Sequence, residues 1–375
     1  MATRLTPPFR ADHVGSLLRP AQVVEARHRH ADGDLSADGL REVEDAAIRP
    51  LVEMQESVGL MSATDGELRR QSWHMDFIYE IGGIERWSDP AQVAEFHTQQ
   101  GDTIISAQGA LRVTDKIHLD HTIFGEDFAT LKSMTTTATP KLTIPSPNMI
   151  YSRGGREAID EAVYPSLDEF WSDLIAAYQE QVRRLGDLGC RYLQFDDTSL
   201  ASINDPEMRA RIAKRGDDAD TLHVTFVQRL NEVLSVKPDG MAITTHMCRG
   251  NYRSSWSAKG SYDFVAEVLF SELAVDGFFV EYDDERSGGF EPLRFVPPGR
   301  MVVLGLVTTK RGELEPKDEL KRRIEEASRY VDIDQLCLSP QCGFASTMEG
   351  NDLSYDQQVD KLRLVDETAQ EVWGD

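Results

Sequence analysis

The stretch Met241-Ala-Ile-Thr-Thr-His-Met-Cys-Arg-Gly-Asn251 has the pattern of a short apolar strand that ends on His246 and Cys248. Side chains two positions apart on a strand point to the same face, so the imidazole and the thiol are expected to converge. An isolated pair of this kind is more often ordinary core packing than a metal site. Its interpretation therefore depends on the segments around it.

Two strand-like segments downstream end in a similar way. The run Val275-Asp-Gly-Phe-Phe-Val280 leads into Glu281, and Gln335-Leu-Cys-Leu-Ser-Pro-Gln341 leads into Cys342. Two sulfurs, one imidazole nitrogen and one carboxylate oxygen suit tetrahedral zinc better than magnesium or calcium, which prefer oxygen ligands. We therefore predict a Zn²⁺ site whose ligands are His246, Cys248, Glu281 and Cys342.

Strand-like and helical segments alternate along the chain. Strands are expected at 12–16, 59–65, 141–145, 191–196, 241–248, 275–281, 301–306 and 335–339. Helices are expected from about residue 20 and at 36–58, 167–188, 221–236, 262–273, 315–331 and 355–372, where apolar residues recur at three- and four-residue steps. Eight strands in alternation with helices predict a single α/β domain over 1–375, a (β/α)₈ TIM barrel.

Residues from about 72 to 138 interrupt this alternation between the second and third expected strands. The segment Ala110-Leu-Arg-Val-Thr-Asp-Lys-Ile-His-Leu119 alternates between apolar and polar residues, as an antiparallel strand does. We predict an irregular and partly antiparallel insertion that folds over a site.

Functional residues of such barrels lie at the C-terminal ends of strands, and several polar residues occupy these ends. Glu67 and Asp196, the candidate catalytic acids, suit binding of the ammonium group of an amino-acid thiol. Ser16 and its neighbouring backbone amides suit the carboxylate, and Asp197 is a further candidate for substrate binding. The alternatives are that Asp196 or Asp197 caps the following turn and that Glu67 pairs with a nearby arginine.

The predicted ligand set favours one kind of chemistry. A thiol that binds zinc does so as thiolate, which gives a nucleophile at neutral pH. Two cysteine thiolates on the metal leave a bound substrate sulfur rich in electrons, which suits alkyl transfer better than hydrolysis. Glu281 is the ligand expected to yield to an incoming thiol, because a carboxylate is the most exchangeable of the four. Of the other histidines, only His13 and His74 lie near the expected barrel mouth.

Composition limits the class of protein and its partners. The 375 residues carry a formal net charge of −24, which speaks against nucleic acid or an anionic membrane as the main partner. The sequence has neither an apolar leader at its start nor an apolar run long enough to span a membrane, so we expect a cytoplasmic protein. Four cysteines in so long a chain do not indicate a disulfide framework.

These segments resemble the cobalamin-independent methionine synthase family over essentially the whole chain. His246-Met-Cys248, the strand that ends in Glu281, and Pro340-Gln-Cys342-Gly343 resemble its zinc site in order and spacing. Val14-Gly15-Ser16, Asp65-Gly66-Glu67 and Gln194-Phe195-Asp196 are similar to its homocysteine-binding segments, which adds Gly15 to the candidate substrate residues. The resemblance is to short members with one catalytic barrel, and it implies zinc-dependent methyl transfer to homocysteine, forming methionine.

Three departures from the family concern the methyl donor. The resemblance covers only the catalytic half of the full-length enzymes, so we expect no counterpart of their N-terminal half, which helps to hold folate. Leu306-Val-Thr-Thr-Lys310 stands where the family has Asp-Ile-His-Ser-Pro, so a histidine thought to assist catalysis is missing. Asp196-Asp-Thr-Ser-Leu-Ala-Ser202 replaces Asp-Glu-Pro-Ala-Leu-Arg-Glu, which removes an acid expected at the pterin.

These departures leave the donor open between 5-methyltetrahydrofolate and another methyl donor, and the sequence gives no oligomeric state. Two alternative functions share the predicted ligands. One is alkyl transfer to a different thiol, as in the related coenzyme M transferases. The other is a non-catalytic protein that binds zinc or thiols, which would keep four fixed protein ligands on the metal.

Overall fold

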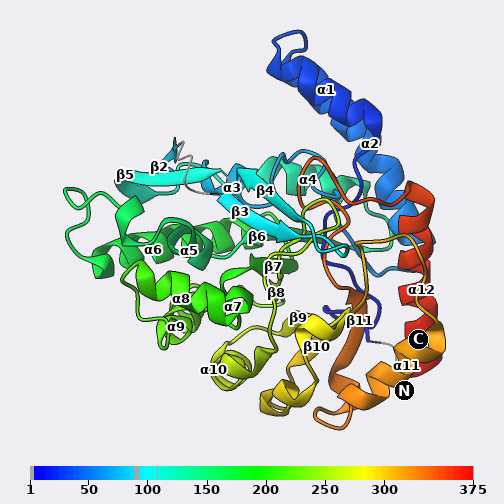
Figure 1. Cartoon of the computed structure of the whole chain (residues 1–375). Coiled ribbons are helices and arrows are strands. Elements are labelled where there is room, and N and C mark those ends of the chain that lie inside the picture. The colour runs from blue at the N-terminus through cyan, green and yellow to red at the C-terminus, as the bar shows by residue number, and fades with distance from the viewer. Residues whose placement is uncertain (1–3, 88–92, 108, 375) are drawn as a thin grey trace.

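A curled parallel sheet forms the centre of the computed structural model, which describes residues 4–87, 93–107 and 109–374 (Figure 1). Within these residues, seven strands follow the order β1-β6-β7-β8-β9-β10-β11, and all neighbouring strands are parallel. They are β1 (Ser62–Ala63), β6 (Thr139–Pro145), β7 (Tyr192–Asp197), β8 (Ala242–Met247), β9 (Gly277–Glu281), β10 (Met301–Val307) and β11 (Leu336–Pro340). Helices alternate with these strands, so the fold is α/β, as predicted.

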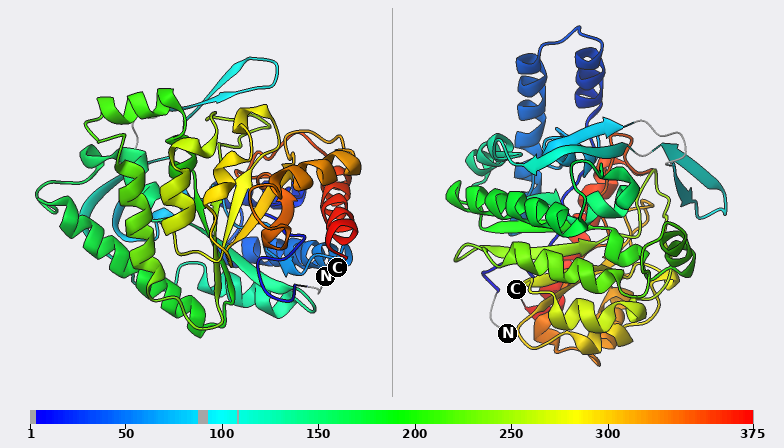
Figure 2. Two further views of the ribbon diagram at one scale, coloured as in Figure 1. Left: turned by 90° about the horizontal axis from the view of Figure 1, so that it is seen from below. Right: turned by 90° about the vertical axis from the view of Figure 1, so that its left-hand side faces the viewer.

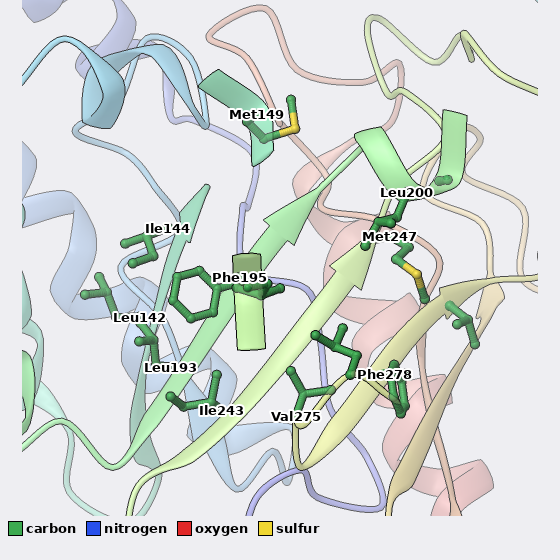
Figure 3. Close-up of a cluster of buried hydrophobic side chains, with 14 of the residues drawn as sticks. Leu142, Ile144, Met149, Leu193, Phe195, Leu200, Ile243, Met247, Val275 and Phe278 are labelled. Carbon is green, nitrogen blue, oxygen red and sulfur yellow. The ribbon is translucent and has the colours of Figure 1, made fainter. Parts of the chain in front are cut away.

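The strands form where apolar residues run almost without interruption. Every residue of β7, β9, β10 and β11 is buried, as expected for parallel strands that are covered on both faces. Leu142, Leu193 and Ile243 are aligned across β6, β7 and β8. Figure 3 shows these side chains within a larger apolar cluster. Burial of each such side chain contributes about 2 kcal/mol.

The first expected strand, 12–16, is wrong as a regular strand. The segment joins β11 through one parallel bridge between Ala11 and Leu338. Beyond this bridge, side chains of β7 and of the residue after β1 bind its carbonyl groups. Gln194 Nε2 donates to the carbonyl of Val14 at 2.7 Å, and Thr64 Oγ1 donates to that of Gly15 at 2.6 Å. Because these two carbonyl groups accept hydrogen bonds from side chains, they do not pair with a neighbouring strand. The described part of the sheet therefore has seven strands instead of the expected eight.

The same segment also contacts the opposite end of the sheet. Asp12 accepts hydrogen bonds from Ser62 of β1 at 2.9 Å and from Tyr192 of β7 at 2.7 Å, and it lies 3.3 Å from the ammonium group of Lys141 in β6. Asp12 and Lys141 are both fully buried, so this polar group sits inside the curled sheet. Residues 9–16 thus touch both edges of the seven strands.

The expected helices form on the outside of the sheet with small differences at their ends. They are α1 (Ala21–Ala31), α2 (Ala37–Ser57), α6 (Leu167–Asp187), α9 (Leu222–Leu234), α10 (Ala266–Glu272), α11 (Lys317–Ala327) and α12 (Tyr355–Trp373). Local capping explains several starts: Ser36 accepts from Gly39 N, and Ser354 forms a capping box with Gln357. Figure 2 shows α1 and part of α2 projecting from the body as a helical hairpin.

The chain between β1 and β6 holds two small antiparallel sheets. β2 (Gly82–Trp87) pairs with β5 (Ala110–His118), where the alternating pattern predicted an antiparallel strand, and β3 (Val93–His97) pairs with β4 (Thr103–Ala107). Two helices, α3 (Met75–Ile78) and α4 (Gly125–Met134), complete the region. The β3–β4 hairpin reaches the loop that follows β8, where His97 and Trp256 exchange backbone hydrogen bonds of 2.6 and 3.1 Å.

Three further helices, which the sequence pattern did not predict, are α5 (Asn148–Gly154), α7 (Ser199–Ser202) and α8 (Pro206–Lys214). The sequence Asp205-Pro206 is typical of a helix start: Asp205 caps α8, and Pro206 occupies its first turn. Across the described ranges, the helices are too short or too polar to cross a bilayer.

Candidate active site

Three of the predicted metal ligands meet at the C-terminal edge of the sheet. His246 lies near the end of β8, Cys248 directly follows this strand, and Cys342 follows β11. One ligand atom from each lies within 4.8 Å of the others, and the two Sγ atoms are 3.3 Å apart. All three side chains are buried. The structure thus brings together a nitrogen and two sulfurs from distant parts of the chain.

The environment of the three side chains fits a soft metal ion. Neither ring nitrogen of His246 has a hydrogen-bond partner in the described part of the chain, whereas buried polar atoms are normally paired. Hydrogen bonding from Cys248 holds the pKa of Cys342 well below its usual value, in spite of burial, and the nearby imidazole acts in the same direction. One imidazole and two thiols, with a thiolate already favoured, form a donor set that suits zinc.

Glu281, the fourth predicted ligand, is placed differently. It ends β9 and is fully buried, but its carboxylate does not join the group formed by the other three. Oε2 accepts the backbone N–H of Arg249 at 3.0 Å, and Oε1 lies 3.2 Å from Nζ of Lys310. Arg286 adds a second cation at 3.6 Å. Its predicted role as a ligand therefore competes with ion pairs inside the protein.

A cavity of about 350 Å³ opens onto the metal-competent residues, and three predicted substrate residues share its wall. These are Ser16, Glu67 and Asp196, all of which are buried. Their convergence on one cavity with His246 and both cysteines agrees with the rule that such sites form at the C-terminal ends of strands. The volume is in the range of small-molecule sites.

The two acids of the cavity are held in environments that favour their neutral forms. Burial raises the pKa of Asp196 to about 7, and the neighbouring Glu67 carboxylate adds to this shift while His246 opposes it. Burial also raises the pKa of Glu67, although Arg70 lies 3.6 Å away and Thr143 donates a hydrogen bond of 2.8 Å. Among the described residues, Oε2 of Glu67 has no hydrogen-bond partner. A bound cation would stabilise both acids in their ionised forms.

Asp197 and Gly15 lie outside the set of described residues that line the cavity. The Asp197 carboxylate accepts from the backbone N–H groups of Ser199 and Leu200, and from the side chains of Ser146 and Asn148. It therefore caps the turn into α7, which was the alternative interpretation of its position.

Gly15 allows a backbone conformation and a close packing that a residue with a side chain would not. Its φ of +144° lies in a region that favours glycine, and a Cβ would come 2.7 Å from Cγ2 of Thr143. Gly343, next to Cys342, has even less room, because a Cβ there would come 1.8 Å from Oγ of Ser16. Both glycines let the chain pack closely around Ser16.

Some cavity residues were not predicted from the sequence. The cavity wall includes the arginines Arg153, Arg211 and Arg215 and the apolar side chains of Met149, Ile212 and Phe226. Arg211 pairs with Glu95 of the β3–β4 hairpin at 2.9 Å. His13 and His74, the two histidines expected near the mouth, do not line the cavity within the described ranges. Burial lowers the pKa of His13 to about 4.

The comparisons with known proteins agree with this fold and site. Residues 9–370 match the family model described as cobalamin-independent synthase, catalytic domain. The uncharacterized protein YxjG of Bacillus subtilis is 47% identical over 371 residues, covering 99% of this chain and 96% of YxjG. A protein of known crystal structure from Listeria monocytogenes shares 37% sequence identity with this chain. The structural match covers 99% of both chains and has a TM-score of 0.78.

A more distant structure shares the fold. It is a B12-independent methionine synthase from a Shewanella species in complex with selenomethionine, at 18% identity, 97% coverage of both chains and a TM-score of 0.70. The curled parallel sheet and the cavity at its C-terminal edge, together with the family model, define a catalytic domain of the cobalamin-independent synthase type. The chain belongs to the cobalamin-independent methionine synthase family.

Proposed function

We propose that the protein is a zinc-dependent methyltransferase that methylates the thiol of homocysteine and forms methionine. The observation that carries the proposal is the meeting of His246, Cys248 and Cys342 within 4.8 Å, on a cavity that Glu67 and Asp196 also line. Family membership supports methyl transfer, and the selenomethionine bound to the Shewanella enzyme supports an amino acid of this shape. We further propose that residues 9–16 complete a (β/α)₈ barrel with the seven strands.

The metal would be held by His246, Cys248 and Cys342. When bound there, zinc lowers the pKa of a coordinating thiol and so supplies a nucleophilic sulfur at neutral pH. The protein positions the rest of the substrate. The reaction forms a bond between this sulfur and the methyl carbon, and it breaks the bond between that carbon and the donor, which leaves with the bonding electron pair.

Glu67 and Asp196 would bind the ammonium group of homocysteine. Two buried carboxyls with raised pKa values gain most from a cation, because its charge offsets the cost of their ionisation. Ser16, on the same wall, would bind the carboxylate together with nearby backbone N–H groups. This arrangement recognises an amino-acid thiol from both of its charged ends.

The two acids also favour homocysteine over coenzyme M, the thiol of the related transferases. Coenzyme M carries a sulfonate and no ammonium group, so it brings no positive charge to offset the cost of ionising Glu67 and Asp196. The methyl donor is either 5-methyltetrahydrofolate or another donor, and we place it against the part of the cavity wall that carries Arg153, Arg211 and Arg215. The arginines and the apolar wall suit a donor that has an anionic group and a flat apolar part.

The test is binding and turnover with purified, zinc-loaded protein. Calorimetry should show that homocysteine binds and that a sulfonate thiol of similar size binds at least tenfold more weakly. Incubation with homocysteine and a panel of methyl donors should yield methionine with one of them. Absence of homocysteine binding would reject the proposal, and binding without turnover by any donor would favour a non-catalytic zinc or thiol-binding protein.

A further inference from the structure

The β3–β4 hairpin forms part of the cavity wall, although it belongs to the insertion between β1 and β6. Ala94, Glu95 and Phe96 line the same cavity as His246 and the two cysteines. The Phe96 side chain is only 7% exposed, but it is not part of the main apolar core formed by the described residues. Its burial therefore comes from contacts at the cavity wall and not from the packing of the sheet.

The hairpin packs on the loop that follows Cys248. His97 and Trp256 exchange two backbone hydrogen bonds, and the next residue of this loop, Ser257, donates its N–H to the carbonyl of Arg249 at 2.9 Å. Arg249 directly follows Cys248 in the chain. A short series of backbone contacts thus connects the hairpin to the segment that carries one of the metal-competent sulfurs.

Gly250 allows Phe96 to approach this loop closely. Its φ of +91° lies in the region that favours glycine, and a Cβ there would come 3.3 Å from Cε1 of Phe96 and 2.7 Å from Cβ of Ser257. The backbone N–H of Gly250 in turn lies 3.3 Å from Sγ of Cys248. The Phe96 ring therefore packs against a turn of the backbone that contacts the sulfur directly.

Phe96 and Tyr252 form an aromatic pair on the cavity wall. Their ring centroids lie 5.2 Å apart, and both residues line the cavity. Tyr252 is only partly buried, so the pair offers ring surface to a ligand. The neighbouring Glu95 pairs with Arg211, one of the three arginines of the wall, at 2.9 Å. The hairpin thus places a flat apolar surface next to the arginines against which we place the methyl donor.

We propose that the β3–β4 hairpin is part of the methyl-donor site and that Phe96, backed by Tyr252, is a specificity-determining contact for a flat ring of the donor. The inference rests on the proposed function and deepens it. A donor has to bring its methyl carbon to the sulfur on the metal, so it must lie close to the loop against which Phe96 packs. Aromatic side chains at such a position favour ligands with planar rings, which stack on them.

The test uses 5-methyltetrahydrofolate as the probe, because it carries a flat ring system and an anionic tail. Calorimetry should show that it binds to the zinc-loaded protein saturated with homocysteine. Phe96→Ala and Phe96→Leu should bind the probe at least tenfold more weakly, because neither side chain offers a ring, and Phe96→Tyr should stay within about threefold of wild type. The leucine variant is decisive, because it keeps most of the buried apolar volume and would restore affinity if Phe96 only held the hairpin in place.

Ile105→Ala is the matched control on the same hairpin. Ile105 pairs with Glu95 across the two strands, is 66% exposed and, among the described residues, does not line the cavity. This variant should bind the probe as wild type does. Zinc content and homocysteine affinity should be unchanged in Phe96→Leu and Phe96→Tyr.

The proposal is overturned if wild-type protein does not bind the probe, or if Phe96→Leu binds it within threefold of wild type. The same titrations without homocysteine separate this inference from the proposed function. If wild-type protein binds no homocysteine, the proposed function fails, while the affinities of the Phe96 variants for the probe still decide the role of the hairpin.

Discussion

The Sγ atoms of Cys248 and Cys342 lie 3.3 Å apart, although 94 positions of sequence separate the two residues. In a flat sheet, the three strand spacings between β8 and β11 would keep the ends of these strands about 14 Å apart. The curl of the sheet therefore creates the site. Because the site depends on the fold, each variant of a site residue below is paired with a control variant outside the site.

Replacing Cys342→Ala should abolish zinc binding and methyl transfer but leave a folded protein. The side chain supplies one of the two sulfurs of the group formed by His246, Cys248 and Cys342, while the sheet is held by the apolar core. Zinc content of the purified variant, with circular dichroism, measures both effects. Cys337→Ala is the matched control, because Cys337 is also buried but lies in a separate apolar cluster, and it should retain zinc. Unfolding of Cys342→Ala alone would indicate a structural metal.

Replacing Glu67→Gln should weaken homocysteine binding roughly tenfold to a hundredfold, which is about 1.4–2.8 kcal/mol, because an amide cannot offset the ammonium charge. Zinc content should not change, since Glu67 is not among the residues that meet the metal. Calorimetry with zinc-loaded protein measures the effect. Glu80→Gln, at a half-exposed glutamate paired with His121, is the control and should bind homocysteine normally. Equal affinity of Glu67→Gln and wild type would remove Glu67 from the substrate site.

Replacing Asp197→Ala should reduce the stability of the protein rather than its affinity for homocysteine. The variant loses the acceptor of two backbone N–H groups and of several side chains at the start of α7. Hydrogen bonds to a charged group contribute about 1.5–3 kcal/mol each, so we expect a loss of at least about 3 kcal/mol in the free energy of unfolding. Urea unfolding measures it. A stable variant with weakened homocysteine binding would support the predicted role of Asp197 in substrate binding.

Stability should fall in acid partly through Glu56. Burial opposes its ionisation, but N–H groups of Thr136, Thr137 and Ala138 and the hydroxyl group of Thr136 lower its pKa from 4.5 to about 2. Because the folded pKa lies below the unfolded value, this contribution is complete above pH 4.5 and is lost as the pH falls toward 2. Glu56→Gln should therefore flatten the pH dependence of the unfolding midpoint over this range. An unchanged slope would show that these hydrogen bonds do not stabilise the fold.

The apolar runs in the sequence correctly predicted the buried strands and the edge of the sheet at which they end. The apolar runs that end in His246, Glu281 and Gln341 are buried parallel strands, and parallel strands place their C-terminal ends on one edge. Because these strand ends share one edge, the cavity there brings together His246, Cys248 and Cys342 with Glu67 and Asp196.

Contacts between distant residues decided the features that the sequence did not reveal. The segment 12–16 looks like a strand, but side chains from Thr64, Lys141 and Gln194 bind its carbonyl groups. Glu281 has a sequence position suited to a ligand, and only the fold shows Lys310 beside it. Part of the cavity wall comes from α5, α8 and the β3–β4 hairpin, which lie far apart in sequence.

X-ray absorption at the zinc edge, with and without homocysteine, tests the central claim most directly. The account predicts one zinc per chain with two sulfur ligands in the free protein, and a third sulfur when homocysteine is added. A protein that takes up no zinc, or a zinc site that keeps two sulfurs at saturating homocysteine, would contradict it.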